Sequence, residues 1–455
     1  MKKIILFLTI LIITMVSFTP IIFAVFKEYS LGGNKLSFVI KYQNTGDDNF
    51  SDGPRLMSDM IPVIWDTDSS KWKIVSATDS NWYNYTEKRW ANAMMPDGKY
   101  DYSTPVGTLI DEDDLGSLFV WIPRYEYKIS YNNVNDYTLG GSIDINLITK
   151  DVVYPTSGYT IHPAFTSGIS TNYDNGQWDK EIDGFWVAKF EMSKEKKATT
   201  WIEDKISRDS EGNIIGDNVS TRMVSKPNRS AWSRITINNA YTASKQASYN
   251  IVNPSILNSH MLKNSEWGAV AYLAYSTFGA NTQPNINNII FSDKSTVTGY
   301  SSTTPSEGAF GGPINPERLY HTYYGVKAST TGNIYGVYDM NGGTNEYTAA
   351  HFTGSPKPLD TNVSNAKYYT VYEPGTISNV GKIGDATFET FRWDKNAAGS
   401  DSVAPATYTS SMYFLRGGAV SNGGGSSKSG IFASYQLNST ILSNYRGFRT
   451  VLIIE

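Results

Sequence analysis

Residues that commonly carry enzymatic chemistry are absent or scattered in this 455-residue sequence. There is no cysteine, which excludes disulfides, thiolate metal sites and cysteine nucleophiles. The four histidines (His162, His260, His321 and His351) lie far apart, with none of the i, i+4 pairs that bind a metal on one helix face. No G-x-S-x-G nucleophile elbow occurs. We therefore expect a structural role for each histidine.

Acidic and basic residues point to no charged partner. The run Asp111–Asp114 lacks the glycine and the ligand spacing of an EF-hand loop, so we expect a solvated turn there. The net charge is −4 and the pI about 5.7, so the chain has no basic field to neutralise phosphates. Nucleic acid is thus excluded as an expected partner.

The segment "RGGAVSNGGGSSKSGIFASYQ", Arg416 to Gln436, is the best candidate for binding. Asn, Ser, Gly and Tyr are the residues that adaptable binding loops use, and loops on a rigid scaffold often carry function. We predict a recognition surface over Val420 to Arg446. The predicted ligand-binding residues are Asn422, Ser427, Phe432, Tyr435, Asn438, Asn444 and Tyr445. The alternative is a solvated loop that only covers a sheet.

Two strand candidates flank this loop, "YFLRGGAV" and "GFRTVLII", and the second is apolar enough for a central strand. "LFVWIPRYEYKIS" and "DGFWVAKFEMS" read as two further strands. The glycine-rich "GNIYGVYDMNGGTNEYTAA" predicts a folded loop and not a strand.

The clearest predicted helix is "NSEWGAVAYLAYSTFG", capped by Asn264 or Ser265. Its apolar residues recur at helical spacing and predict one buried face, formed by Trp267, Val270, Ala271 and Ala274. "YTASKQASY" is a weaker helix candidate.

The N-terminus begins with two lysines and an uncharged stretch from Ile4 to Phe26, long enough to cross a bilayer. It could be a signal peptide, but we favour a membrane anchor, with everything after about Lys27 outside the cell. Residues 27–114 form a predicted Trp/Tyr-rich β module or spacer, including a hairpin in "MIPVIWDTDSSKWKIV". Its clustered aromatics would more often fill a core than form a sugar-binding platform.

From about residue 115 to the end, the order of motifs resembles the formylglycine-generating enzyme family, or sulfatase-modifying factor domain. The motifs are "FVWIPRYEYKI", "DGFWVAKFEMS", "KNSEWGAVAYLA", "YGVYDMNGGTNEYTA", "FLRGGAV" and "RGFRTVL". The resemblance implies an α+β, C-type-lectin-like fold over 115–455, with a small twisted antiparallel sheet and many irregular loops.

The resemblance also implies where chemistry is lost. The two copper-binding cysteines of the enzymes would fall near Asn422 and Ser427, whose oxygens cannot replace thiolates for Cu(I). Copper-dependent formylglycine generation is therefore excluded. Relatives often hold calcium around the segment that contains Glu346 here, but the usual Asn is Gly343. Glu346 could bind calcium or pair internally with Arg416 or Arg449.

These observations predict a non-enzymatic binding or adhesion module, secreted or anchored at the cell surface, with a glycan or protein ligand. In the same fold, variable proteins of diversity-generating retroelements place their variable residues in the corresponding loop. Two alternatives stay open: an enzyme of unknown chemistry that uses the pocket of the fold, and a structural component of a surface or virion.

Overall fold

The computed structural model describes residues 53–57, 59–168, 177–194, 207–208, 214–215, 223–251, 257–289, 296–302, 315–353, 359, 363–391, 393, 407–408, 413–418, 429–437 and 445–454. The predicted anchor or signal peptide, 1–26, lies outside these ranges. Within them, no helix has both the length and the apolar character needed to span a membrane.

The largest element is a sheet of eight strands in which all neighbours are antiparallel. In spatial order the strands are β14 (Ser259–Met261), β22 (Thr450–Leu452), β9 (Gly184–Ala188), β5 (Leu118–Pro123), β3 (Asn92–Met94), β1 (Ile61–Asp66), β2 (Lys71–Ile74) and β4 (Leu109–Ile110). The predicted hairpin is confirmed, since β1 pairs with β2 from Val63 opposite Ile74 to Asp66 opposite Lys71. The predicted C-terminal strand "GFRTVLII" is divided at Arg449: its apolar run forms β22 inside this sheet, as expected for a central strand, and its first residues belong to β21 (Arg446–Phe448) in another sheet.

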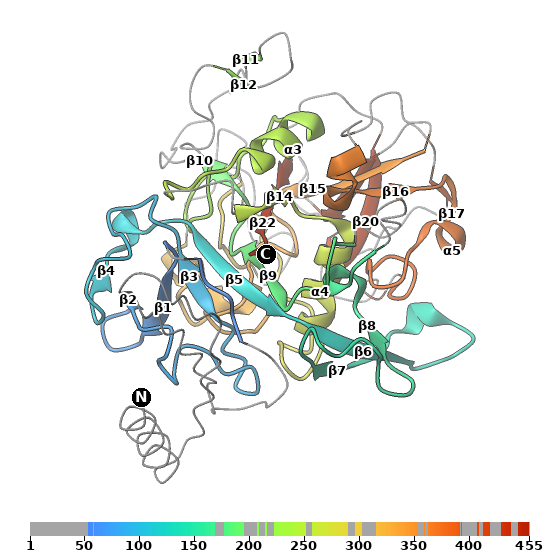
Figure 1. Ribbon diagram of the computed structural model, residues 1–455, viewed down its shortest axis with the longest axis horizontal. Helices are drawn as coiled ribbons and strands as arrows, with labels where there is room; N and C mark the ends of the chain where they lie inside the picture. The colour runs from blue at the N-terminus through green and yellow to red at the C-terminus, as the bar shows by residue number, and fades with distance from the viewer. Residues whose placement is uncertain are drawn as a thin grey trace, which may run out of the picture.

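Strands from the predicted N-terminal module continue directly into the rest of the chain. β3 pairs with β5 across the proposed boundary at 114, with Asn92 opposite Val120. Figure 1 shows β1 to β4 on the left, beside β5. Three of the clustered aromatics are interior residues, since Trp82, Tyr85 and Trp90 are at most 4% exposed. These three side chains fill the core, as predicted, whereas Tyr83 is half-buried.

The segment "LFVWIPRYEYKIS", predicted as one strand, is two strands in two sheets. β5 ends at Pro123, and β6 (Tyr125–Tyr131) joins β7 (Gly141–Leu147) and β8 (Thr160–Ile161) in a three-stranded sheet. Between them, buried Arg124 donates to the carbonyls of Phe165 (2.7 Å) and Val152 (3.1 Å). These hydrogen bonds fix Arg124 at the point where the chain passes from the eight-stranded sheet to the three-stranded sheet.

A third sheet carries the candidate binding loop. β16 (Thr370–Tyr372), β15 (Asn345–Phe352), β19 (Tyr413–Gly417) and β20 (Gly430–Leu437) follow one another, and β21 (Arg446–Phe448) pairs in parallel with β15. The prediction of a loop over the whole glycine-rich segment was therefore wrong at its end. The loop stops at Thr344 and β15 begins at Asn345, where glycines give way to apolar and β-branched residues.

Of the described α-helices, the two longer ones are α3 (Ile237–Lys245) and α4 (Asn264–Ala274). α4 begins where the sequence predicts it and ends five residues before the predicted Gly279, whereas α3 begins and ends four residues before the predicted helix Tyr241–Tyr249. The expectation of one buried face on α4 was wrong, because all eleven residues are buried. Figure 1 shows why: α4 lies in the middle of the molecule, between β9 and β20. The N-cap is Lys263, one residue before the predicted position, and its backbone N–H donates to the Glu266 carboxylate (2.9 Å).

The remaining elements are short. Three two-stranded pairs are β10 (Ser193–Lys194) with β13 (Met223–Val224), β11 (Ser207–Arg208) with β12 (Ile214–Ile215), and β17 (Gly375–Thr376) with β18 (Thr407–Tyr408). α5 spans Ile377–Val380. The 3-10 helices are η1 (Glu112–Asp114), η2 (Tyr137–Leu139), η3 (Pro163–Phe165), η5 (Pro316–Arg318), η6 (Gly325–Ala328) and η7 (Val363–Tyr368). The acidic run thus forms a single turn at η1, as expected.

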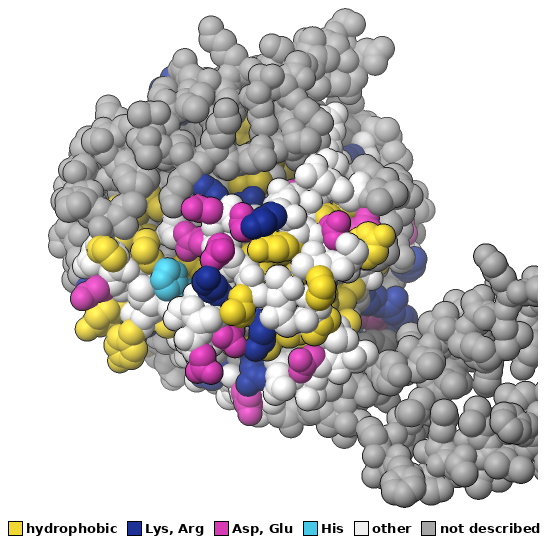
Figure 2. Space-filling model, turned by 90° about the vertical axis from the view of Figure 1, so that its left-hand side faces the viewer, with side chains coloured by type: hydrophobic (Ala, Val, Ile, Leu, Met, Phe, Trp, Pro, Cys, Tyr) yellow, Lys and Arg dark blue, Asp and Glu magenta, His cyan; other side chains and the backbone are white. Residues whose placement is uncertain are grey.

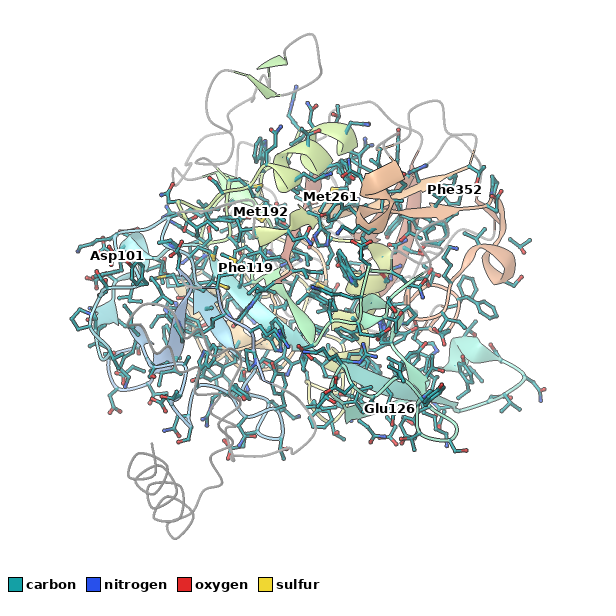
Figure 3. All side chains as sticks on the ribbon, in the orientation of Figure 1. Asp101, Phe119, Glu126, Met192, Met261 and Phe352 are labelled. Atoms are coloured by element: carbon teal, nitrogen blue, oxygen red, sulfur yellow. The ribbon has the colours of Figure 1, made fainter. Side chains whose placement is uncertain are left out.

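One hydrophobic core joins the two larger sheets through α4. Figure 3 shows Phe119, Met192 and Met261 in the centre of the molecule, whereas Phe352 lies on the far side of the five-stranded sheet. The described chain is mostly strand with few helices and long irregular connections, which agrees with the predicted α+β, loop-rich class.

The anchored root of a candidate binding loop

Four of the predicted ligand-binding residues, Asn422, Ser427, Asn438 and Asn444, lie outside the described residues. Phe432, Tyr435 and Tyr445 are described, and so are the two ends from which the segment leaves the sheet. The site can therefore be built from the residues that fix these ends.

Two glycines begin the loop because the backbone turns left-handed there. Gly417 and Gly418 have φ values of 78° and 79°, a region that side-chain-bearing residues rarely adopt. A Cβ on Gly417 would also stand 3.1 Å from the Trp267 ring. Gly417 pairs with Gly430 at the start of β20, so both ends of the segment 418–429 leave the sheet side by side.

The far end of this segment is held by α4 and by a distant loop. Trp267 on α4 donates its indole N–H to the Ile431 carbonyl at 2.7 Å. The Ile431 N–H donates to Gln283 Oε1 at 3.0 Å. Both backbone groups of Ile431 are thus satisfied by side chains from other parts of the chain, which fixes the start of β20.

The near end is held by a buried arginine. Arg416 is 0% exposed, and its guanidinium donates to the carbonyls of Ala386 (2.7 Å) and Asp385 (3.2 Å). The same guanidinium lies 5.6 Å from the Trp267 ring centroid. Burial of a charge is tolerated where hydrogen bonds compensate it. Arg416 therefore belongs to the anchor of the loop.

The described predicted residues do not share one environment. Phe432 is 4% exposed and packs on Tyr275 (5.1 Å between ring centroids) and Trp393 (5.6 Å). Contact with a ligand would require its ring to leave the core. Tyr435 and Tyr445 are half-buried, on β20 and just before β21. Of the three, only the two tyrosines are placed to contact a ligand directly.

Polar atoms without partners gather around the same root. Within the described residues, buried Gln283 Nε2, Asn341 Oδ1 and Ser429 Oγ have no hydrogen-bond partner. Asn341 donates its amide to the Pro284 carbonyl (2.7 Å), and the neighbouring Gly342 N–H donates to the Gly417 carbonyl (3.0 Å). Each unmade hydrogen bond of a buried polar group costs about 1–3 kcal/mol. Three buried polar side-chain atoms at the root of the loop therefore make no hydrogen bond.

Sequence reasoning missed Gln283 and Asn341 as members of this site. Gln283 is 148 residues from its partner Ile431 in the chain, and nothing in its local pattern marks it. Asn341 lies in the glycine-rich segment, which was recognised, but only the fold brings that segment against Gly417.

Glu346 lies in an internal ion pair, the alternative to calcium that the sequence left open. It is fully buried on β15, and both carboxylate oxygens accept from Arg449, at 2.5 Å and 3.0 Å. Arg449 also donates to the carbonyls of Ala188 and Tyr338. A calcium ion at Glu346 would have to displace or face a guanidinium, so these donors do not fit the ion.

Two more carboxyl groups lie near this pair. Glu191 accepts from the backbone N–H and hydroxyl of Thr344 (2.7 and 2.9 Å), and Asp339 accepts from the Asn287 amide (2.8 Å). Burial raises the pKa of Glu191 well above its usual range, and the charges of Asp339 and Glu346 raise it further. Among the described residues, no set of His, Asp and Glu side chains has the arrangement of a metal site.

Each histidine lies in a separate environment. His162 packs among Tyr125, Tyr127, Phe165 and Tyr272. His260 Nε2 is 2.9 Å from Glu266 Oε1, His321 stacks on Trp65, and His351 lies against Tyr369. These contacts fit the structural roles expected from the sequence.

No protein-family model matches the chain, and no curated protein matches it in sequence. The solved structure of PvdO from Pseudomonas aeruginosa has 11% identity and a TM-score of 0.29, covering 77% of this chain and 99% of its own. Treponema denticola variable protein 1 has 10% identity and a TM-score of 0.28, with the same coverage. At such TM-scores the likeness carries no argument about fold or function.

Proposed function

We propose that this chain is a non-enzymatic binding or adhesion module at the cell exterior, and that the segment Val420 to Arg446 recognises its glycan or protein ligand. The observation that carries the proposal is the anchoring of the loop root. Gly417 and Gly418 start the stretch 418–429, and Trp267 and Gln283 fix Ile431 just after it, at the start of β20. A rigid scaffold beneath a polar segment is the arrangement that loop-based recognition uses.

Two further features support a ligand at this place. Because the root is held by side chains from distant parts of the chain, less ordering entropy is lost when a ligand binds. Half-buried Tyr435 and Tyr445 add aromatic surface with a polar tip.

The scaffold itself is part of the proposal. We infer a C-type-lectin-like fold of the formylglycine-generating enzyme type from the six ordered motifs. The enzymes' copper chemistry has no counterpart here, because the sequence contains no thiolate to bind Cu(I). A scaffold of this type without its metal ligands is suited to binding.

The test uses the full-length chain in a mild detergent, probed against glycan and protein arrays. A variant with Asn422, Asn444 and Tyr445 changed to alanine should lose at least about tenfold in affinity for any ligand found, since a central contact is worth over 1 kcal/mol. Tyr154→Ala is the matched control, because Tyr154 is 86% exposed and lies far along the chain from the loop.

Three outcomes would overturn the proposal: binding that survives the triple change, turnover of an array compound that depends on a polar residue of the root, or ordered polymers with no ligand at all. The last two favour the enzyme and the structural component respectively. Protease or antibody access to the chain on intact cells tests the proposed location.

A further inference from the structure

A second exposed surface lies between η5 and η6, away from the loop root. Tyr323 and Tyr324 are 74% and 40% exposed, and their rings meet edge to face with centroids 5.1 Å apart. Figure 2 shows hydrophobic side chains beside a surface histidine. His321 is partly exposed, whereas His162, His260 and His351 are buried. Tyrosine suits a binding surface because its ring is apolar and its hydroxyl is polar.

Cations hold the two tyrosine rings in place. The Lys327 ammonium lies 4.7 Å from the Tyr323 ring centroid and 5.7 Å from that of Tyr324. The Arg318 guanidinium lies 4.8 Å from the Tyr324 centroid. Such contacts at exposed sites are worth about 0.5–1 kcal/mol each, enough to bias the ring orientations.

The backbone beneath the tyrosines is also fixed. The Thr322 hydroxyl donates to the Leu319 carbonyl (2.8 Å) and accepts from the Gly325 N–H (3.0 Å), and the Val326 N–H donates to the Thr322 carbonyl (3.0 Å). A Cβ on Gly325 would stand only 1.6 Å from the Leu319 carbonyl oxygen, so the turn closes tightly on itself. The tyrosines are therefore presented in a preformed arrangement.

This turn rests on the edge region of the large sheet. The Trp65 ring on β1 stacks on His321, with centroids 5.9 Å apart and an interplanar angle of 23°. Trp65 also meets Trp72 and Tyr320 edge to face. Ring contacts thus link His321, two residues before Tyr323, to the buried aromatic side chains Trp72 and Tyr320.

The charges around the tyrosines are mixed in sign. Arg318 and Lys327 contribute cations, while Glu112 lies 3.9 Å from His321 and Glu317 is exposed beside Arg318. A polyanion would meet both carboxylates. A ligand that is neutral and rich in hydroxyl groups can hydrogen-bond to both signs, since hydroxyls donate and accept.

The exposed area also argues for a small ligand. At about 200 Å² for each tyrosine side chain, the two rings expose roughly 200–250 Å². A stable dimer interface needs about 800 Å² on each partner. The patch is therefore too small to hold a second copy of the chain by itself.

From this geometry we propose a carbohydrate-binding site formed by Tyr323 and Tyr324, with Lys327 and Arg318 as hydrogen-bond donors, for a neutral pyranose. The C–H face of the sugar stacks on an exposed tyrosine ring, and its hydroxyls reach the flanking charged groups. This site is separate from the loop root and does not depend on the function proposed above.

The test titrates the full-length chain in detergent with cellohexaose, maltohexaose and chitohexaose, followed by calorimetry and by quenching of intrinsic fluorescence. At least one oligosaccharide should bind saturably. Tyr323→Ala should weaken that binding about tenfold or more and Lys327→Met about threefold, the effects of losing roughly 1.4 and 0.6 kcal/mol. Tyr154→Ala, another exposed tyrosine, should bind as wild type does.

Failure of all three oligosaccharides to bind, or equal binding by Tyr323→Ala and wild type, overturns the proposal. Self-association that Tyr323→Ala abolishes would also overturn it, in favour of an interface between copies. Tyr323→Phe, which keeps the ring, controls for misfolding and should retain most of the affinity. The loop variant with changes at Asn422, Asn444 and Tyr445 should bind these oligosaccharides normally if its own ligand differs.

Discussion

His162 gives the chain a pH-dependent stability that can be calculated from its surroundings. It is fully buried, and its Nδ1 accepts the Ala164 N–H at 3.2 Å at the start of η3. Burial lowers the pKa of His162 from the ordinary 6.5 to about 3, and the backbone of Gly384 opposes this only in part. The folded protein therefore keeps the ring neutral at pH values where the unfolded chain protonates it.

The direction of the effect follows from proton binding. Below 6.5 the unfolded chain takes up a proton at His162, and the folded chain does so only near pH 3. Stability from this residue is thus complete above about pH 6.5 and falls as the pH drops. Between about pH 7 and about pH 5 the loss amounts to about 2 kcal/mol, because below pH 6.5 only the unfolded chain takes up the proton, at about 1.4 kcal/mol for each pH unit.

The assay is urea unfolding of wild type and His162→Asn across this pH range. Asparagine caps a helical turn as well as histidine does here and does not titrate. The variant should be less stable at neutral pH, because it loses aromatic packing, but its stability should fall about 2 kcal/mol less on acidification. Buried carboxyl groups with raised pKa values, such as Glu191, change stability in the opposite direction in both proteins, so the comparison removes their effect. Parallel pH profiles for the two proteins would refute the reasoning.

Three other substitutions test the buried ion pair of Arg449, the left-handed turn at Gly417 and the packing of Phe432. Arg449→Met should cost about 3–5 kcal/mol in urea unfolding because it leaves Glu346 buried without a counter-charge, and adding Glu346→Leu should restore part of that loss. Gly417→Ala should lower stability by about 1–2 kcal/mol, from its positive φ and its closeness to Trp267, and weaken ligand binding by the loop. Phe432→Ala should cost about 3–5 kcal/mol in thermal or urea unfolding, as for a core aromatic, and a loss under 1 kcal/mol would show that its ring is not packed.

Local patterns in the sequence predicted local structure well. The hairpin of β1 and β2 and the start of α4 lie where turn residues and helical spacing place them. α3 overlaps its predicted segment, Tyr241–Tyr249, over five residues only. The burial of α4 on all sides could not be predicted from its pattern. Small residues such as Gly268 allow close approach, and a Cβ there would stand 1.9 Å from the Gly384 carbonyl oxygen. Only the packing of distant chain segments reveals that constraint.

Most of the features that the sequence did not predict are contacts between residues far apart in the chain. The sequence left Arg416 and Arg449 as possible partners of Glu346, and both lie on or next to strands that pair with β15. In the structure Arg449 donates to Glu346, whereas Arg416 donates to the carbonyls of Asp385 and Ala386. No local sequence pattern indicates that Gln283 accepts a hydrogen bond from Ile431, or that the chain passes to another sheet at Arg124. For the candidate binding loop, the residue types could be read from the sequence, but the side chains that fix its two ends could be identified only from the fold.

The position of β22 has a consequence for how the chain reaches its native state. β22 lies between β9 and β14, and no other described strand fills that gap. The facing edges of β9 and β14 therefore stay unpaired until the residues near 451 are present and form β22. During synthesis the half-built sheet would expose two open edges for most of translation, a period in which such edges invite aggregation. A premature stop before Thr450 should thus yield a chain that chaperones and proteases recognise, even though nearly all of the core residues are already present.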